Sequence, residues 1–134
     1  MMTIVDCSRE YWEFVRLLRN DPRVSSGFIE TGLVSEEDQL KYMHVNSKFY
    51  KVCLIDGISC GYFGVIDKDI RICTHPKHQR KGVGSFMLRE IVKYFPDAIG
   101  KVKLNNSKSR GLFSSAGFSE YKNDGSYVFY KYQN

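Results

Sequence analysis

A short segment rich in basic residues and glycine has the composition of an anion-binding loop. The segment is Gln79-Arg80-Lys81-Gly82-Val83-Gly84, and it lies between a strand-like stretch and a stretch with helical spacing of apolar residues. Glycines at a strand-to-helix junction let the backbone approach a ligand, and the free N–H groups of the first helical turn point toward it. The order of these residues therefore predicts a site for phosphate groups.

Two common phosphate-binding motifs do not fit this segment. The phosphate loop of nucleotide hydrolases needs a longer glycine spacing followed by Lys-Ser or Lys-Thr, whereas here Gly84 is followed by Ser85 and Phe86. A dinucleotide fingerprint needs a third glycine three residues on, where this chain has Met87. The pattern that remains is Gln/Arg-x-x-Gly-x-Gly after the end of a strand at Thr74-His75-Pro76.

This pattern resembles that of the GNAT superfamily of acetyl-CoA-dependent N-acetyltransferases. Asn106 and the later segment FSSAGF are similar to the family's Asn-x-x-Ala-x-x-x-Tyr-x-x-x-Gly-Phe, with Ser109 at the Ala position. The expected order of strands and helices also matches, so the resemblance covers nearly the whole chain.

The resemblance implies that acetyl-CoA is the co-substrate and that no metal is needed. The backbone N–H groups from Arg80 to Ser85 would hold the pyrophosphate, and Gln79 would begin that loop. The strand Ile72-Cys73-Thr74 would diverge from the next strand and bind the pantetheine amides through its backbone. Asn106 would also contact the cofactor, although an Asn after a strand is equally typical of a cap or turn. The cofactor-binding residues expected on this basis are Ile72, Cys73, Thr74, Gln79, Arg80, Lys81, Gly82, Val83, Gly84, Ser85 and Asn106.

The general acid is the point at which the chain departs from the family. The family usually supplies a Tyr in the helix after the fifth strand, and the matching position here is Phe113, which has no proton to donate. Three explanations remain open. Another residue donates the proton, the thiolate leaves without a proton donor because the pKa of the thiol is already near 8.5, or the protein binds the cofactor without turnover. The hydroxyl candidates are Ser114, Ser115, Tyr121 and Tyr127.

The candidates for the general base lie beside the fourth expected strand. Asp67 and Asp69 flank its start, although the sequence IDKD is also typical of a plain hairpin turn. His75 lies near its end and titrates in the useful pH range. A covalent route through Cys73 is disfavoured, because a Cys in a strand usually belongs to the core. The candidate catalytic residues are therefore Asp69, His75 and Tyr121.

The acceptor is expected to be a primary amine of a small molecule or a protein. Acidic residues in the expected acceptor wall would suit a cationic amine; they are Glu30, Glu36, Glu37 and Asp38. The surrounding segment also faintly resembles family members that acetylate amino groups on nucleotide-linked sugars, which are neutral to anionic. These two readings conflict, and both stay open at this point. A domain that binds acetyl-CoA or a partner without catalysis is the alternative function, motivated by Phe113.

The pattern of apolar residues predicts a single α+β domain over residues 1–134, with the order β-α-α-β-β-β-α-β-α-β-β. The strand-helix-strand unit from Ile70 to Leu104 is expected to be a right-handed parallel crossover. In the first helix the expected inner face holds Tyr11, Phe14, Val15 and Leu18. In the second helix, which begins after the capping residue Ser35, the expected inner face holds Leu40, Met43 and His44.

Composition and charge exclude several classes of protein. The net charge is +5 over 134 residues, and residues 71–110 hold ten Lys and Arg against two Asp and Glu, which suits polyanionic coenzyme A. No recognition motif accompanies this basic block, so nucleic acid is not expected as a partner. No apolar run is long enough to span a membrane and no leader pattern is present, so a cytoplasmic protein is expected. Either a monomer or a homodimer is expected, and the family resemblance implies that a homodimer would pair through its last strands.

The cysteines show no metal-binding or redox spacing. Cys7, Cys53, Cys60 and Cys73 are irregularly spaced and form no CxxC pair. We expect them to be reduced core residues.

Overall fold

The expected α+β architecture is confirmed in a computed structural model, which describes residues 1–25, 28–29 and 32–132. One mixed sheet has the strand order β1-β2-β3-β4-β5-β7-β6. The strands are β1 (Met2–Asp6), β2 (Tyr50–Ile55), β3 (Ile58–Ile66), β4 (Asp69–Thr74), β5 (Ile99–Lys103), β6 (Phe118–Asn123) and β7 (Tyr127–Tyr132). The α-helices are α1 (Trp12–Asn20), α2 (Pro22–Ser25), α3 (Glu36–Asn46), α4 (Val83–Tyr94) and α5 (Ser107–Ser115). Short 3-10 helices cover Arg9–Tyr11, Ser47–Phe49 and Pro76–His78.

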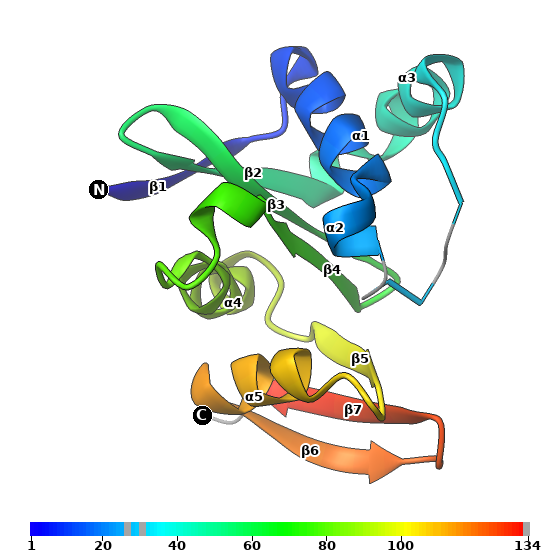
Figure 1. Cartoon of the computed structure of the whole chain (residues 1–134), viewed down its shortest axis with the longest axis vertical. Coiled ribbons are helices and arrows are strands. Elements are labelled where there is room, and N and C mark those ends of the chain that lie inside the picture. Colours follow the sequence, from blue (N-terminus) through cyan, green and yellow to red (C-terminus); the bar gives the residue numbers. More distant parts are fainter. Residues whose placement is uncertain (26–27, 30–31, 133–134) are drawn as a thin grey trace.

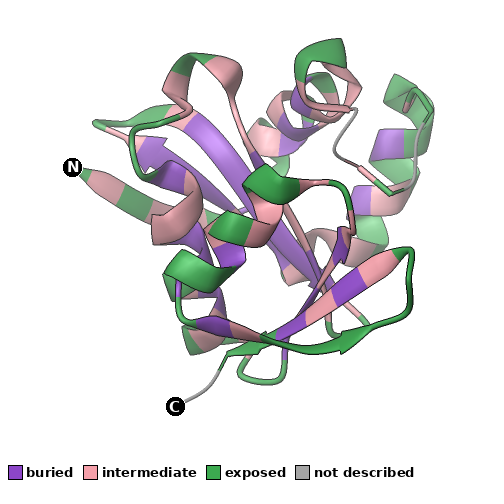
Figure 2. Ribbon diagram, turned by 60° about the horizontal axis from the view of Figure 1, so that its bottom comes forward, coloured by how far each residue is buried: buried purple, intermediate pink, exposed green. Residues whose placement is uncertain are grey.

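The helices cover the sheet in two layers, with α1 to α3 on one face and α4 and α5 on the other (Figure 1). Each layer has its own core: Trp12, Val15 and Leu18 of α1 pack with Met43 and Tyr62, whereas Met87, Leu88 and Ile91 of α4 pack with Phe63. Burial is concentrated in the central strands and on the inner sides of the helices (Figure 2).

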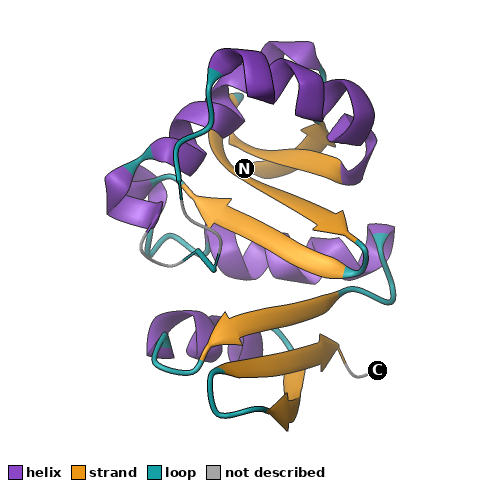
Figure 3. Ribbon diagram, turned by 90° about the vertical axis from the view of Figure 1, so that its right-hand side faces the viewer, coloured by secondary structure: helices purple, strands orange, loops and turns teal. Residues whose placement is uncertain are grey.

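The expected parallel crossover is confirmed, because α4 joins β4 to the parallel strand β5. The two strands pair only at Asp69 and Ile99, where the Ile99 N–H donates to the Lys68 carbonyl at 2.7 Å. Beyond that point they diverge, and Figure 3 shows the opening between them as a V. A gap therefore lies at the carboxyl ends of β4 and β5.

The expected inner face of the second helix was right for Met43 and wrong for Leu40 and His44, because the helix is rotated so that Gln39 faces inward. Its start is as expected, since the Ser35 hydroxyl accepts from the Asp38 N–H at 3.1 Å. The buried residues of α3 are Gln39 and Met43, whereas Leu40 is 41% exposed and His44 is also exposed. Gln39 turns inward because its side-chain amide donates to the Trp12 carbonyl at 2.8 Å, which satisfies a buried polar group. This rotation points Tyr42 toward the sheet instead of toward solvent.

Two details of the first helical region also differ from expectation. The chain forms a 3-10 turn at Arg9–Tyr11 before α1 begins, and the short helix α2 follows α1. Val15 and Leu18 are buried as expected, whereas Tyr11 and Phe14 are only half-buried and Trp12 takes a buried position. The Trp12 ring is held inward because its N–H donates to the Cys7 carbonyl at 3.0 Å.

In the part of the chain that the structure describes, no helix has the length and apolar character needed to cross a membrane.

Gly100 in β5 is predicted to be required for packing, because a Cβ atom there would overlap the ring of Phe113. We expect Gly100→Ala to lower the free energy of unfolding by about 1–3 kcal/mol through overpacking. Gly111→Ala is the control, since an added Cβ there meets nothing within 4 Å and Ala favours the helix, by up to about 1 kcal/mol. Urea denaturation of both variants checks this, and equal stability of the two would contradict the packing described.

Candidate functional site

The edges of β4 and β5 that face the gap carry backbone groups not used by the sheet. The His75 N–H donates to the Cys60 carbonyl at 2.8 Å, so residues 60 and 75 form a hydrogen-bonded pair. Such pairs alternate along an antiparallel ladder, so the backbone groups of Cys73 also face β3, while those of Ile72 and Thr74 face β5. Since β5 has already diverged, the gap presents donors and acceptors from Ile72 and Thr74 to a ligand.

The loop that follows β4 turns sharply into the N-terminus of α4. Arg80 has φ of 66° and Gly82 has φ of 82°, and both values lie in the left-handed region. Gly82 is the N-cap of α4, so the N–H groups of Val83, Gly84 and Ser85 have no partner within the helix. Together with the helix dipole, these groups give the terminus the chemistry that suits an anion.

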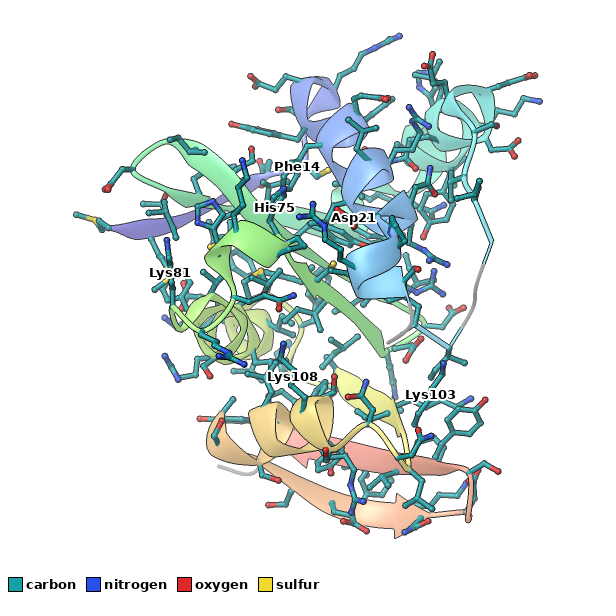
Figure 4. All side chains as sticks on the ribbon, in the orientation of Figure 1. Phe14, Asp21, His75, Lys81, Lys103 and Lys108 are labelled. Carbon is teal, nitrogen blue, oxygen red and sulfur yellow. The ribbon has the colours of Figure 1, made fainter. Side chains whose placement is uncertain are left out.

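Helix α5 lies against this loop and adds positive charge to it. Lys108 Nζ donates to Gln79 Oε1 at 3.0 Å, and Figure 4 places Lys81 and Lys108 beside α4 and α5. A Cβ on Gly84 would approach Leu112 Cδ2 of α5 to 3.0 Å, so glycine allows the two helices to come close. Gly82, in contrast, is required for its left-handed backbone, since a Cβ there would meet nothing within 4 Å.

Asn106 joins the gap to α5. It is the N-cap of α5, and its Oδ1 accepts from the Ser109 N–H at 3.1 Å. Asn106 and Ser109 both line a cavity that lies between β4 and β5. The side chain therefore has a capping role and lies at a cavity wall at the same time.

A cavity of about 540 Å³ extends through the sheet at the point where β4 and β5 diverge. Arg19, Gln39 and Tyr42 line it from the layer of α1 and α3, whereas Ser109 and Phe113 line it from the opposite layer, where Phe113 packs on Gly100. Two ligands can thus meet inside it from opposite faces of the sheet. The other lining residues are Val15, Phe28, Ile29, Leu33, Val34, Asp38, Met43, Tyr50, Tyr62, Asp69, Ile70, Arg71, Ile72, Lys101, Val102 and Asn106.

A hydrogen-bonded group of polar side chains lies on the α1–α3 side of the cavity. The hydroxyls of Tyr42 and Tyr50 are 2.7 Å apart, and Arg71 Nη1 donates to the Tyr42 hydroxyl at 3.4 Å. Arg71 Nε lies 3.9 Å from Asp69 Oδ2. Burial, together with the Tyr42 hydroxyl, raises the pKa of Tyr50 well above its usual value, so this phenol stays protonated at neutral pH.

Of the three catalytic candidates from the sequence, only Asp69 lines the cavity. The ring of His75 stabilises the turn after β4, because its Nδ1 accepts a hydrogen bond from the Lys77 N–H at 3.1 Å. Burial and the charge of Arg23 lower the pKa of His75, and Figure 4 shows it near Asp21 at the end of α1. Tyr121 lies on the edge strand β6, 42% exposed, with Lys131 Nζ 4.4 Å from its ring centroid. Neither His75 nor Tyr121 is among the cavity residues.

The other hydroxyl candidates are also away from the cavity, because Ser114, Ser115 and Tyr127 are not among its lining residues. Phe113 is buried, with its ring stacked on Tyr130 at a centroid distance of 5.3 Å. The sequence patterns missed Tyr42, Tyr50 and Arg71. The alternation of β4 could have placed Arg71 beside Asp69, but the wrong helical phase of α3 concealed Tyr42.

The expected acidic wall contributes one carboxylate to the cavity. Asp38 lines it, whereas Glu36 lies 3.7 Å from Arg16 and Glu37 lies 3.1 Å from Lys41 on the outer surface of α3. Glu30 lies outside the described residues. Among the described residues that line the cavity, three are basic, Arg19, Arg71 and Lys101, and two are acidic, Asp38 and Asp69.

The cysteines are free and buried, as the sequence indicates. Burial raises the pKa of Cys7, Cys53 and Cys73 to about 12, and it also raises that of Cys60. Among the residues that the structure describes, no group of three His, Cys, Asp or Glu is placed to hold a metal ion.

Comparisons with known proteins identify this architecture. Residues 27–120 match the family model of the acetyltransferase (GNAT) domain. A comparison with curated protein sequences finds no significant match.

Solved structures of low sequence identity share the fold. Spermidine N-acetyltransferase from Vibrio cholerae, in complex with CoA and spermine, superposes with a TM-score of 0.80 at 17% identity, covering 96% of this chain and 92% of that one. Ribosomal-protein-alanine N-acetyltransferase from Brucella melitensis gives 0.79 at 16% identity, covering 96% and 97%. The protein yncA of Salmonella typhimurium, with its cofactor acetyl-CoA, gives 0.78 at 18% identity, covering 96% and 91%.

The raised thiol pKa values predict that the folded protein is inert to thiol reagents. At pH 8 a thiol with a pKa of about 12 is ionised to only about one part in ten thousand, and the thiolate is the reactive form. We expect a disulfide reagent such as DTNB to modify no cysteine in the folded protein and all four cysteines in guanidinium. A single fast-reacting thiol assigned to Cys73 in the folded protein would contradict this and reopen a covalent route.

Proposed function

The chain belongs to the GNAT acetyltransferase family, and from this premise we propose that it transfers the acetyl group of acetyl-CoA to a primary amine. One observation carries the proposal: the cavity extends through the sheet at the β4–β5 gap, with Ser109 and Phe113 of α5 on one side and Asp69 and Tyr42 on the other. Helix α5 also contacts the loop before α4, through the hydrogen bond from Lys108 to Gln79. This arrangement lets a donor and an acceptor reach the same point from opposite faces.

The residues around the gap fit acetyl-CoA. The N–H groups from Arg80 to Ser85 would hold its pyrophosphate at the positive end of α4, and Lys108 would add charge beside them. The backbone of Ile72 and Thr74 would bind the pantetheine amides, while Cys73 directs its backbone to β3. Bound there, acetyl-CoA supplies an acetyl group activated as a thioester.

The acceptor amine must lose a proton before it can attack. An alkylamine with a pKa near 10.4 is mostly protonated at pH 7. Asp69, in the cavity wall and bordered by Arg71, is the carboxylate that would take this proton directly or through water. The amine nitrogen then forms a bond to the acetyl carbon, and the bond from that carbon to sulfur breaks.

The sulfur of the departing coenzyme becomes a thiolate, and a nearby hydroxyl could donate a proton to it. Phe113 cannot supply it, and Ser114, Ser115, Tyr121 and Tyr127 do not line the cavity. Tyr42 and Tyr50 do; their hydroxyls are hydrogen-bonded to each other, and Arg71 Nη1 donates to the Tyr42 hydroxyl. Tyr42 is therefore the hydroxyl that we assign to proton transfer, with Tyr50 as the residue that positions it. The alternative of a binding domain without catalysis rests on Phe113 alone, and no other observation favours it.

Loss of the left-handed turn at Gly82 is predicted to abolish cofactor binding. Gly82→Glu adds a carboxylate where the pyrophosphate would lie, so we expect the Kd for acetyl-CoA to rise at least about 100-fold. Gly57→Glu is a matched control, because Gly57 has φ of 83° and an added Cβ there also meets nothing within 4 Å. Both variants carry the same backbone strain, so calorimetric titration separates folding from binding. Equal affinity of the two variants would refute the assigned loop.

Removal of the Asp69 carboxylate is predicted to slow catalysis without loss of cofactor binding. We expect Asp69→Asn to lower kcat about 100-fold, with partial recovery at high pH, where the amine deprotonates in solution. The control is Asp67→Asn in the adjacent turn, which is exposed and outside the cavity lining. Thiol release across a pH series measures both. An unchanged pH profile in Asp69→Asn would assign the base elsewhere.

Replacement of the Tyr42 hydroxyl tests the proton donor. Tyr42→Phe should lower kcat about tenfold to 100-fold while the Kd for acetyl-CoA stays constant, because only proton transfer is affected. Tyr94→Phe serves as the control, since Tyr94 is at the end of α4, is 45% exposed and does not line the cavity. Pre-steady-state thiol release distinguishes the two variants; an unchanged rate in Tyr42→Phe, or an equal loss in both, would overturn the assignment.

A further inference from the structure

Among the residues that the structure describes, no helix covers one face of the C-terminal strands β5, β7 and β6. Figures 1 and 3 show α5 on one side only of β5, β7 and β6. On the α5 side, Gly100, Val102, Val128 and Tyr130 are buried. Strand alternation therefore places the side chains between them on the opposite face.

This open face carries lysines interleaved with aromatic rings, beside Ile99 and Ser119. Lys101 Nζ lies 4.4 Å from the Tyr127 ring centroid and 6.0 Å from that of Phe129. Lys122 Nζ lies 4.9 Å from the Phe129 centroid. Cation–π contacts of this kind hold the ammonium groups over the rings instead of leaving them to sample many rotamers. We call this surface the lysine–aromatic face; its members are Lys101, Lys103, Tyr121, Lys122, Tyr127, Phe129 and Lys131.

The lysine–aromatic face has a single sign of charge. Among the described residues of β5, β6 and β7, none of the side chains on this face is acidic, since Glu120 points to the α5 side and lies 3.6 Å from Arg110. Asp124, in the turn between β6 and β7, accepts at Oδ1 from the N–H groups of Tyr127 and Ser126, and these bonds together with the charges of Lys122 and Lys101 lower the pKa of its carboxyl. Within the described part of these strands and this turn, the four lysines of the face therefore have one such carboxylate beside them, which leaves an excess of positive charge.

The face is continuous with the cavity. Lys101 belongs to both, and it lines the cavity together with Arg71 and Asp69. Figure 4 places Lys103 beside β5 and β7, well apart from Lys81 and Lys108 at the cofactor loop. An anion held here would thus belong to the acceptor and not to the coenzyme.

We propose that the acceptor is an amine that carries an anionic group, and that Lys101 and the adjoining lysine–aromatic face bind that group. The proposal rests on the acetyltransferase function proposed above. Charge complementarity selects this occupant: a second copy of the chain would set lysines against lysines, and a polycationic amine would be repelled. Asp38 and Asp69 receive the ammonium end, so the site matches both charges of a zwitterion. The anion is a phosphate or a carboxylate, which share this chemistry.

Two matched pairs of amines distinguish the two anions. Glucosamine 6-phosphate is compared with glucosamine, and phenylalanine with phenylalaninamide, by calorimetric titration into protein saturated with CoA. CoA fills the loop at α4, so phosphate cannot bind there. We expect at least one anionic member to bind about tenfold more tightly than its neutral partner, with the advantage reduced by 0.5 M KCl. The pair that shows the advantage identifies the anion.

Variants locate the binding site. Lys101→Gln should raise the Kd for the anionic member about tenfold and leave the Kd for its neutral partner unchanged. Lys101→Arg should retain most of it. Lys93→Gln on α4, which removes a lysine paired with Glu90 at 2.5 Å, should have no effect.

The outcomes separate the two proposals. Equal or weaker binding of both anionic members overturns the charge preference, as does an advantage that survives in Lys101→Gln. Thiol release is measured with the same amines and acetyl-CoA. Charge-dependent binding without thiol release for any amine would instead count against the acetyltransferase function.

Discussion

The divergence of β4 from β5 is the constraint on which the rest of the molecule depends. A parallel pair that meets only at Asp69 and Ile99 leaves the backbone groups of Ile72 and Thr74 without strand partners. Backbone donors and acceptors in a protein interior need partners, from water or from a ligand. The gap therefore both opens a passage through the sheet and lines it with the hydrogen-bonding groups that an extended amide chain requires.

The surrounding elements keep this gap open and give its two sides different chemistry. On one side, the left-handed turn at Gly82 directs the N-terminus of α4 to the gap, and Gly84 lets α5 pack beside it. On the other, Gln39 fixes the rotation of α3, so that Tyr42 reaches Tyr50 and Arg71. Phe113 fills the space against Gly100 as part of the core, and its phenyl ring has no proton to donate.

Local patterns in the sequence predicted most of the fold and the glycine-containing turn into α4. The strands and helices are encoded by apolar periodicity and caps such as Ser35, and the glycine loop by short-range backbone requirements. The inner face of α3 was not predictable in this way, because it depends on a tertiary hydrogen bond from Gln39 to Trp12. His75 and Tyr121 have suitable chemistry, but their position relative to the cavity depends on the turn after β4 and on the edge strand β6. The assignments of Ile72, Thr74 and the loop residues to acetyl-CoA stay predictions.

Amide hydrogen exchange along β4, measured by NMR with and without CoA, tests the central claim most directly. The Cys73 N–H is already bonded to β3, so its protection should change little. The Ile72 and Thr74 N–H groups face the gap, so at least one of them should become strongly protected when CoA binds. Binding that protects the loop at Gly82 to Gly84 but leaves Ile72 and Thr74 unchanged would contradict the account, because the gap would then not hold the coenzyme.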